Sequence, residues 1–339
     1  MTNPSKKETL LTKEDLERQG KEFSKSLFER ASHEEVVKEK VLLLVGGISS
    51  EREISLESGR CVKKALENLK YNVVCFDLKE GLEKLILVIK NEKPDCVFNA
   101  LHGGWGENGC VQAFLNMMQI PYTHSGVLAS SLAMNKDETK RIAKSHNLDV
   151  PKGILVSQSF FKDKETVDFS CVIKPNQEGS SVGVYILNKG DAIPAFLKSE
   201  NAPKSFLIEE YIAGREFSVA VTDEGALGLI EIVPLDGFYD YEHKYSKGLT
   251  EHVVPTDLST ALKNKLMQEA YIMHQALGCK GVSRSDFRYD PAEDRLVFLE
   301  LNANPGMTNL SLVPEMALQK GISYNSLVNK LIEKADFEK

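Results

Sequence analysis

The sequence lacks the features that mark nucleic-acid-binding, membrane-spanning and disulfide-stabilised proteins. Its 339 residues carry 42 basic and 49 acidic side chains in interspersed order, so no basic footprint for a polyanion is present. No window approaches the roughly 20 apolar residues of a membrane span, and no N-terminal stretch joins a basic start to a long apolar run. The six cysteines are scattered without a Cys-x-x-Cys pair. We therefore expect a globular protein of the reducing cytoplasm, with no nucleic-acid and no membrane partner.

Two familiar nucleotide-binding fingerprints are missing as well. The loop that follows the apolar run at 171–174 contains no Gly-Lys-Ser/Thr, so it is not a Walker loop. The glycines that follow the run at 41–45 lack the spacing of a dinucleotide fingerprint, which disfavours a dehydrogenase.

The pattern of apolar runs indicates an N-terminal extension followed by three α/β blocks. Residues 1–39 are highly charged and predict an appended helix or arm. From 40 to 124, short apolar runs followed by glycines predict a parallel α/β sheet. The loops at the carboxyl ends of such strands form the ligand crevice, which places Glu51 and His102 where a small molecule would bind.

The second and third blocks are expected at 125–210 and 211–339. A helix rich in Ala, Lys and Arg is predicted from about residue 125 to 146. The third block contains a polar loop at about 235–252 and an amphipathic helix at 262–277, which a glycine ends.

The segment 283–302 predicts a β-hairpin around the turn Asp290-Pro-Ala-Glu-Asp294. The side-chain period of two divides this hairpin into a core face and a polar face. The residues expected on the core face are Phe287, Val297, Leu299 and Leu301. Those expected on the polar face are Arg284, Asp286, Arg288, Phe298, Glu300 and Asn302. Carboxylate and amide oxygens at this density suit Mg²⁺ when a nucleotide supplies the rest of the shell, but a salt-bridged sheet surface explains the pattern equally well.

A lysine followed by a glycine-serine loop marks a candidate phosphate site. Lys174 ends an apolar strand, and the backbone N–H groups of the loop up to Gly183 can wrap phosphate oxygens. A plain hairpin connection remains the alternative. Lys136 and Lys244 are further candidates for phosphate contacts, with solvated surface lysines as the alternative. The segment 207–217 can present backbone groups to an adenine edge and a carboxylate to ribose.

Taken in order, these segments resemble the ATP-grasp superfamily and, within it, the D-alanine:D-alanine ligases. The resemblance runs from about Lys40 to the C-terminus. Its most specific segments are Gly47-Ile-Ser-Ser-Glu-Arg-Glu-Ile-Ser55, Leu101-His-Gly-Gly104, Gly179-Ser-Ser-Val-Gly183, Tyr239-Asp-Tyr-Glu-His-Lys-Tyr245 and Glu300-Leu-Asn-Ala-Asn-Pro-Gly-Met-Thr308. It implies an α/β, three-domain ATP-grasp fold, α+β in the ATP-grasp part, with an N-terminal parallel α/β domain. ATP would be clamped between the central and C-terminal domains.

The resemblance also implies a role for each candidate residue. The ATP-binding residues would be Lys136, Lys174, Glu209, Glu210, Tyr211, Glu216 and Lys244. Two Mg²⁺ ions, which Mn²⁺ can replace, would be held by Asp286, Glu300 and Asn302. The substrate-binding residues would be Glu51, His102, Ser311 and Leu312. The catalytic residues would be Glu51, Ser180, Tyr245, Arg284 and Gly306.

The activity implied by the resemblance is the ATP-dependent ligation of two D-alanines through an acyl phosphate, in peptidoglycan precursor synthesis, by a homodimer. A related ligase that uses D-lactate or D-serine as acceptor stays open. A nucleotide-binding regulator that has lost catalysis is the third interpretation, and the intact Asp286, Glu300, Asn302 and Arg284 argue against it. The sequence departs from the family at Tyr211, where many relatives have tryptophan, and at His243 inside the polar loop at about 235–252, which the resemblance implies is a lid over the site.

Overall fold

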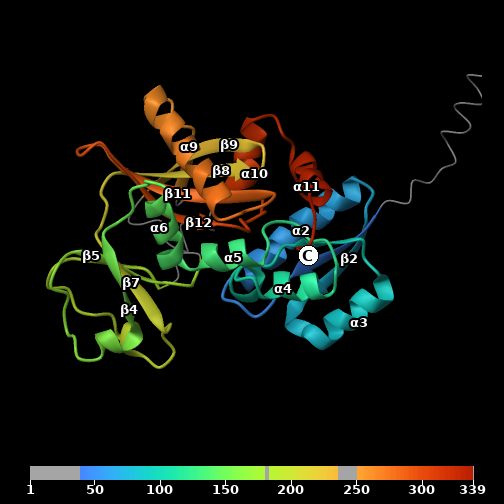
Figure 1. Cartoon of the computed structure of the whole chain (residues 1–339), viewed down its shortest axis with the longest axis horizontal. Coiled ribbons are helices and arrows are strands. Elements are labelled where there is room, and N and C mark those ends of the chain that lie inside the picture. Colours follow the sequence, from blue (N-terminus) through green and yellow to red (C-terminus); the bar gives the residue numbers. More distant parts are fainter. Residues whose placement is uncertain (1–38, 180–182, 236–249, 339) are drawn as a thin grey trace, which may run out of the picture. The chain divides into compact units, whose positions relative to one another are not determined.

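The computed structural model describes residues 39–179, 183–235 and 250–338. The predicted N-terminal extension, apart from its last residue, lies outside the described residues. So do most of the polar loop predicted at about 235–252 and three predicted site residues, Ser180, Lys244 and Tyr245. The described part contains three sheets and the helices that pack on them (Figure 1).

The first sheet is parallel, as predicted. Its strand order is β2-β1-β3, and both pairings with the central strand β1 run parallel. Residues 41–44 of β1 are fully buried, because helices cover the sheet. The strands are β1 (Lys40–Val45), β2 (Asn72–Asp77) and β3 (Cys96–Asn99), and the helical segments are α2 (Arg52–Asn68), η1 (Leu78–Glu80), α3 (Leu82–Glu92), η2 (Gly104–Gly106) and α4 (Cys110–Met117).

The second sheet has four antiparallel strands in the order β4-β7-β5-β6. Its core is aromatic: Phe161 and Phe206 are fully buried and their rings meet edge to face, with centroids 5.5 Å apart. The strands are β4 (Gly153–Ser157), β5 (Cys171–Pro175), β6 (Tyr185–Leu187) and β7 (Ser205–Glu209), with the short helical segments η3 (Gln158–Phe161) and α7 (Ala195–Lys198).

The third sheet has five antiparallel strands in the order β10-β9-β8-β11-β12. Helix α9 covers it and ends before Gly278, whose φ of +70° suits glycine, so the predicted C-terminal glycine is confirmed. The strands are β8 (Arg215–Thr222), β9 (Gly225–Pro234), β10 (Thr250–Val253), β11 (Val282–Asp290) and β12 (Arg295–Asn302), and the helices are α5 (Val127–Met134), α6 (Lys136–Ser145), α9 (Thr260–Ala276), α10 (Leu312–Gln319) and α11 (Tyr324–Glu333).

The single helix predicted over 125–146 is wrong, because two helices occupy this segment. Asn135 separates α5 from α6 with an extended backbone, at φ −88° and ψ 94°. Its side chain accepts a hydrogen bond from the backbone N–H of Glu138, as an N-cap residue does. Both helices pack against the five-stranded sheet, although the sequence analysis grouped them with the second block. The predicted domain boundaries stay predictions.

The predicted hairpin forms, but its two faces differ from the prediction beyond Asp286. Asp286 pairs with Glu300, whereas the next residue, Phe287, pairs with Phe298, so Leu299 forms a β-bulge. Phe298 is therefore fully buried against Phe287 in the core, and Leu299 lines a pocket on the polar face. A bulge shifts the alternation by one residue, and the period of two alone does not reveal it.

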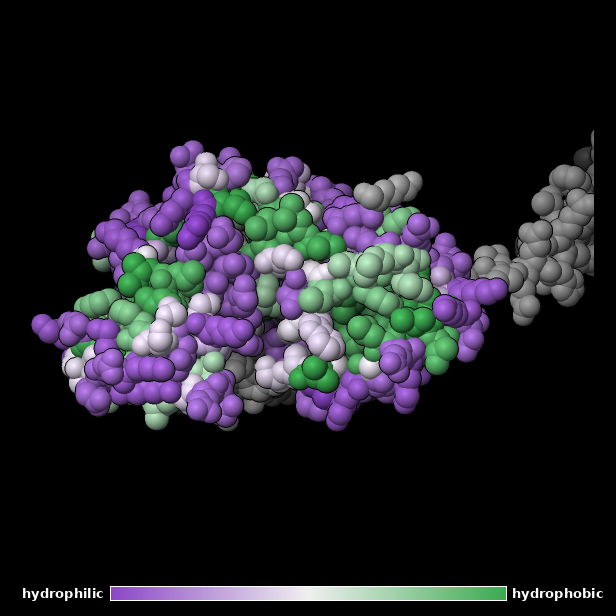
Figure 2. Space-filling model, turned by 60° about the horizontal axis from the view of Figure 1, so that its bottom comes forward, coloured by the Kyte–Doolittle hydropathy of each residue, from purple (hydrophilic) through white to green (hydrophobic). Residues whose placement is uncertain are grey.

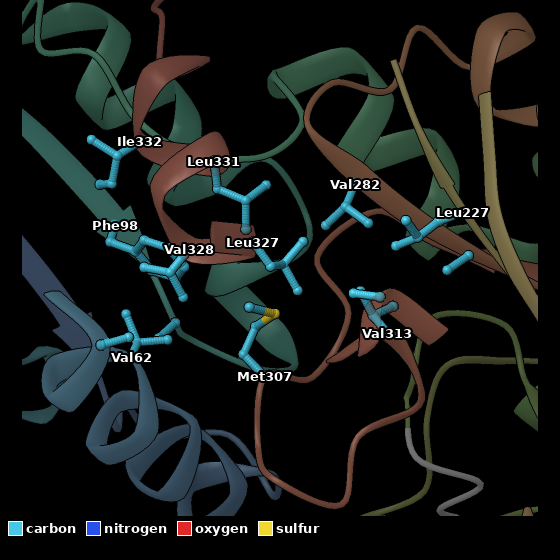
Figure 3. Packing of buried hydrophobic residues seen from close by; sticks show 14 of the residues in the cluster. Val62, Phe98, Leu227, Val282, Met307, Val313, Leu327, Val328, Leu331 and Ile332 are labelled. Atoms are coloured by element: carbon cyan, nitrogen blue, oxygen red, sulfur yellow. The ribbon is translucent and has the colours of Figure 1, made fainter. Parts of the chain in front are cut away.

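One hydrophobic core joins the parallel sheet to the five-stranded sheet (Figure 3). Val62 on α2 and Phe98 on β3 belong to the same buried cluster as Val282 on β11, and so does Val328 on α11. This core fixes the carboxyl ends of the parallel strands next to the polar face of the hairpin. The sequence-predicted crevice and the predicted metal site therefore belong to one place in the fold.

The surface carries no continuous apolar belt on the face that Figure 2 shows, where hydrophobic residues gather in separate areas among hydrophilic ones. Among the helices of the described residues, none combines the length and the apolar character that crossing a membrane requires.

Candidate functional site

The predicted site residues that the structure describes line two pockets. We call the first the Arg284 pocket; among its lining residues are Glu51, His102, Arg284, Asn302, Gly306, Ser311 and Leu312. We call the second the Tyr211 pocket; among its lining residues are Lys174, Glu209, Glu210, Tyr211 and Glu216. Lys136, Asp286 and Glu300 line both. The two pockets are therefore neighbours, and Lys136, Asp286 and Glu300 lie on their common border.

Lys136 is held at this border by the start of helix α6 and by the loop after β5. Its backbone N–H donates to the carbonyl of Asn176, and its ammonium donates to the carbonyl of Glu178 at 2.6 Å. The same ammonium lies 3.5 Å from Glu300 Oε2. Lys136 is the first residue of α6, where the helix dipole adds positive potential. A phosphate at the border would meet a cation and the positive end of a helix.

Lys174 and Lys140 share the carboxylate of Glu209. The Lys174 ammonium lies 3.0 Å from Glu209 Oε2, and the Lys140 ammonium binds Oε1. Burial alone would raise the pKa of Glu209, but the two ammonium groups outweigh it and lower that pKa. The pKa of Lys140 is lowered, first by its burial and then by the charge of Lys174. Glu209 is therefore an ionised carboxylate between two buried lysines.

Tyr211 and Glu216 both contact Arg288, a residue to which the sequence analysis gave no role. The guanidinium of Arg288 lies 5.4 Å from the centroid of the Tyr211 ring, as in a cation–π contact, and 3.3 Å from a Glu216 carboxylate oxygen. Glu210 is held by Arg295 at 2.8 Å and by the backbone N–H of Lys152 at 2.9 Å. An aromatic ring with flanking carboxylates suits a nucleoside, whose base stacks while its hydroxyls donate to oxygen acceptors.

Asp286 and Glu300 lie side by side at the border of the pockets. Arg284 donates to both oxygens of Asp286, from Nε at 3.0 Å and from an Nη at 2.8 Å, and the hydroxyl of Ser218 donates to Oδ1. Asn302 shares their face, opposite Arg284 on the neighbouring strand. Three hard oxygen donors next to the ammonium of Lys136 suit Mg²⁺. Within the described ranges, no group of three or more His, Cys, Asp and Glu side chains could hold a metal by itself.

Glu51 and His102 come from the carboxyl ends of β1 and β3, as predicted. Nε2 of His102 lies 2.8 Å from the hydroxyl of Ser58, and Nδ1 lies 3.3 Å from Glu107. Glu51 is buried and precedes helix α2. A Cβ on Gly103 would lie 2.5 Å from Glu51 Oε2, so this glycine makes room for the carboxylate. A buried carboxylate that lines a pocket suits an ammonium ligand.

Ser311 begins helix α10 on the other side of the Arg284 pocket. It occupies the N-cap position, and its hydroxyl accepts a hydrogen bond from the backbone N–H of Thr308 at 3.0 Å. The exposed N–H groups and the dipole of a helix N-terminus favour a carboxylate. The Arg284 pocket therefore offers an anionic group at Glu51 and an anion-binding helix end at Ser311, which suits amino-acid ligands.

Several residues of the site had no role in the sequence analysis. These are Lys140, Asn176, Glu178, Ser218 and Arg288. Ser218 could have been found, because it lies two residues after Glu216 on one strand and so shares its face. Lys140 could not, since its partner Glu209 is 69 residues away in the sequence and lies on a different element.

Comparisons with known proteins agree with this geometry. Residues 150–333 match the family model described as D-ala D-ala ligase C-terminus, and residues 81–125 match the one described as D-ala D-ala ligase N-terminus. A protein of Wolbachia pipientis wMel named D-alanine-D-alanine ligase is 46% identical over 297 residues, which cover 86% of this chain and 93% of that protein.

Solved structures give the same result. A crystal structure of D-alanine-D-alanine ligase from Bacillus anthracis is 31% identical, with a TM-score of 0.75, and the match covers 87% of this chain and 97% of that one. The structure of a Bacillus anthracis D-alanine-D-alanine ligase complexed with ATP is 28% identical, with a TM-score of 0.71 and the same coverage. The three-domain ATP-grasp fold class predicted from the sequence is confirmed, and the chain belongs to the D-alanine-D-alanine ligase family.

Proposed function

We propose that this enzyme joins two D-alanine molecules into D-alanyl-D-alanine with the conversion of ATP to ADP and phosphate, as a step of peptidoglycan precursor synthesis. The observation that carries the proposal is the common border of the two pockets. Lys136, Asp286 and Glu300 line both, so a nucleotide in the Tyr211 pocket points its phosphates at amino acids in the Arg284 pocket. The acceptors D-lactate and D-serine are not favoured, because the curated relatives carry the D-alanine-D-alanine ligase name.

The nucleotide binds in the Tyr211 pocket. Glu209, Glu210 and Tyr211 frame the adenine, and Glu216 accepts hydrogen bonds from the ribose. Lys136 and Lys174 neutralise the phosphates. The proximity of Arg288 to both Tyr211 and Glu216 supports this assignment, because one guanidinium orients the ring and the carboxylate together.

The two D-alanines bind in the Arg284 pocket. Glu51 pairs with the ammonium of the first, and His102 lies near its carboxylate. Ser311 and Leu312, at the N-terminus of α10, receive the carboxylate of the second. Ser180, Lys244 and Tyr245, for which we propose the closing contacts of the site, lie outside the described residues.

The reaction then has two steps. A carboxylate oxygen of the first D-alanine attacks the γ-phosphorus; a P–O bond forms and ADP leaves, which gives an acyl phosphate. The neutral amine of the second D-alanine attacks the acyl carbon, and a C–N bond forms through a tetrahedral oxyanion. Arg284 and the backbone N–H of Gly306 stabilise this oxyanion. Phosphate leaves as the C–O bond breaks, and the new amide nitrogen releases a proton to solvent.

Asp286, Glu300 and Asn302 fit two Mg²⁺ ions, which Mn²⁺ can replace. When bound with ATP, such ions neutralise the charge that develops on the transferred phosphoryl group. Arg284 keeps Asp286 in place with two of its five N–H donors. The same residue lines the Arg284 pocket, where it can contact a ligand as well.

We also propose a cytoplasmic homodimer with a three-domain division at 40–124, 125–210 and 211–339. The parallel sheet within residues 40–99 supports the first of these divisions. Sedimentation of the purified protein measures the oligomeric state.

The proposal is tested with purified protein, ATP, Mg²⁺ and D-alanine. Phosphate release that depends on D-alanine, with D-alanyl-D-alanine as the product, is expected. Parallel reactions with D-lactate or D-serine added to D-alanine should leave the dipeptide dominant. Phosphate release that is indifferent to D-alanine, or a dominant ester or mixed dipeptide, would refute the assignment.

A further inference from the structure

Lys140 is a buried cation that lies near the site but lines neither of the two pockets. Its side chain is 7% exposed, yet Lys140 lines neither the Arg284 pocket nor the Tyr211 pocket. An ammonium in such a place needs a strong partner, because desolvation of a charge is costly. That partner is Glu209, whose own side chain is only 3% exposed.

The carboxylate of Glu209 is divided between two lysines. Oε1 binds Lys140, and Oε2 lies 3.0 Å from the ammonium of Lys174. Of the two cations, Lys174 lines the Tyr211 pocket. Without Lys140, both oxygens of Glu209 would be available to Lys174, and a carboxylate binds a single buried cation more tightly when it has no other partner.

Helix α6 carries both Lys140, which binds Glu209, and Lys136, which lies at the border of the pockets. Lys136 and Lys140 are four residues apart on α6 and so lie on the same side of the helix. Lys136 reaches Glu300 on the five-stranded sheet, and Lys140 reaches Glu209 on the four-stranded sheet. The helix therefore bridges the two sheets that flank the Tyr211 pocket with one ammonium on each.

We propose that Lys140 is a positioning residue for the nucleotide. It binds one carboxylate oxygen of Glu209 and thereby weakens the ion pair between Glu209 and Lys174. The ammonium of Lys174 then remains able to bind phosphate. This inference rests on the proposed function, in which Lys174 binds the phosphates. Lys140 touches neither the nucleotide nor the amino acids. Its main effect reaches the site through Glu209.

The test replaces Lys140 with methionine, which keeps the length of the side chain and removes the charge. Binding of ADP with Mg²⁺ is measured by calorimetry on the full chain, together with KM for ATP and for D-alanine. Nucleotide affinity should fall about tenfold, which corresponds to roughly 1.4 kcal/mol. KM for D-alanine should stay close to the wild-type value, because the Arg284 pocket is unchanged. Lys144→Met removes an exposed lysine from the same helix and should bind ADP as the wild type does.

A double variant separates this role from a general loss of packing. In Lys140→Met with Glu209→Gln, the carboxylate that competes for Lys174 is gone. The affinity for ADP should therefore equal that of Glu209→Gln alone, whatever Glu209 itself contributes to the adenine site, which is a non-additive result in a double-mutant cycle. Lys140→Arg, which keeps a cation on Glu209, should lose less affinity than Lys140→Met. If Lys140→Met does not fold, Lys140→Gln and the double variant give the same comparison.

Unchanged ADP affinity in Lys140→Met would overturn the inference, and so would a double variant that binds ADP more weakly than Glu209→Gln alone. Equal increases in KM for ATP and for D-alanine would show that Lys140 has a purely structural role. Failure of the proposed function has a different signature, since the wild type itself would then release no phosphate in response to D-alanine. The ADP measurements do not depend on that outcome.

Discussion

Asp286 on β11 and Glu300 on β12 face each other directly across the hairpin. Opposed carboxylates repel, so such a pair is unfavourable in a sheet unless cations stand beside it. Here Arg284 binds Asp286, and the ammonium of Lys136 lies 3.5 Å from Glu300. The bulge at Leu299 lies next to Glu300 and interrupts the ladder between the pairs of Asp286 and Phe287. The two carboxylates thus stand side by side where the pockets meet because a cation accompanies each of them.

The first prediction concerns Glu300→Gln. Turnover should fall about 100-fold or more, the size of effect that follows the loss of one group that stabilises developing charge. The midpoint of thermal unfolding should be equal to the wild-type value or higher, because the repulsion from Asp286 is relieved. Phosphate release and thermal denaturation measure the two effects.

Glu293→Gln is the control for this change, since Glu293 is an exposed carboxylate in the turn of the same hairpin. It should leave both measurements at the wild-type values. Wild-type turnover in Glu300→Gln would remove Glu300 from the proposed metal site.

The second prediction concerns the support of Asp286. Ser218 is fully buried, and its hydroxyl donates to Asp286. Ser218→Ala should lower the free energy of unfolding by about 1–3 kcal/mol, the cost of leaving a buried charged acceptor with one bond fewer. It should also lower kcat, because the carboxylate is less firmly held. Urea unfolding and steady-state kinetics check the two effects.

Ser285→Ala is a matched control one residue before Asp286. Ser285 is also fully buried, but its hydroxyl has no hydrogen-bond partner in the part of the chain that the structure describes. Removal of an unpaired buried hydroxyl should leave stability unchanged or slightly increase it. Equal destabilisation in both variants would show that volume, and not the bond to Asp286, sets the loss.

Much of the fold follows from local signals in the sequence. The apolar runs before glycines predict the parallel sheet, because buried parallel strands need continuous apolar residues. The turn at 290–294 predicts the hairpin, and the period of two brings Arg284, Asp286, Glu300 and Asn302 to one face. These predictions are correct because each depends on neighbours in the chain or on one short turn.

The remaining features depend on contacts between distant segments. Asn135, the N-cap of α6, also accepts a hydrogen bond at 2.8 Å from the side chain of Asn176, which lies on the loop after β5. The bulge at Leu299 is accompanied by a hydrogen bond from the N–H of Phe298 to the carbonyl of Asp149. No local pattern specifies either contact, so the sequence analysis placed Phe298 and Leu299 on the wrong faces.

The third prediction uses two neighbouring glycines. Gly103 and Gly104 both have positive φ, of +64° and +48°, and Gly103, whose ψ is 170°, has a backbone that is essentially confined to glycine. Alanine at either position should cost about 1–3 kcal/mol of stability in backbone strain, and more at Gly103 than at Gly104. Only at Gly103 does the added Cβ meet Glu51, at 2.5 Å from Oε2; at Gly104 the nearest atom is Cβ of Ser49 at 3.6 Å.

Gly103→Ala should therefore displace the carboxylate of Glu51. KM for D-alanine should rise about tenfold, as when a charged hydrogen bond of roughly 1.5–3 kcal/mol is weakened. Gly104→Ala should keep the wild-type KM. Titration of D-alanine against phosphate release measures both, and equal KM values in the two variants would contradict the role of Glu51.

The fourth prediction concerns acid stability and His124. This histidine is buried against the ring of Phe98, and burial, with a smaller effect from His102, lowers its pKa to about 3. An unfolded histidine has a pKa of about 6.5. Above that pH the imidazole is neutral in both states, and its contribution to stability is fully present. As the pH falls from about 6.5 toward 3, only the unfolded state binds the proton, so the free energy of unfolding should decrease by up to about 1.4 kcal/mol per pH unit.

Urea unfolding at pH 7.5, 6.5 and 5.5 measures this slope. His124→Asn should reduce it, because asparagine does not titrate and tolerates the φ of +70° at this position. The variant should be less stable than the wild type at pH 7.5, since the contact with Phe98 is lost. His274, whose pKa is also lowered by burial, keeps part of the slope in the variant. His146→Asn, at an exposed histidine, should leave the slope unchanged. A slope in His124→Asn equal to that of the wild type would mean that His124 binds a proton in the folded protein.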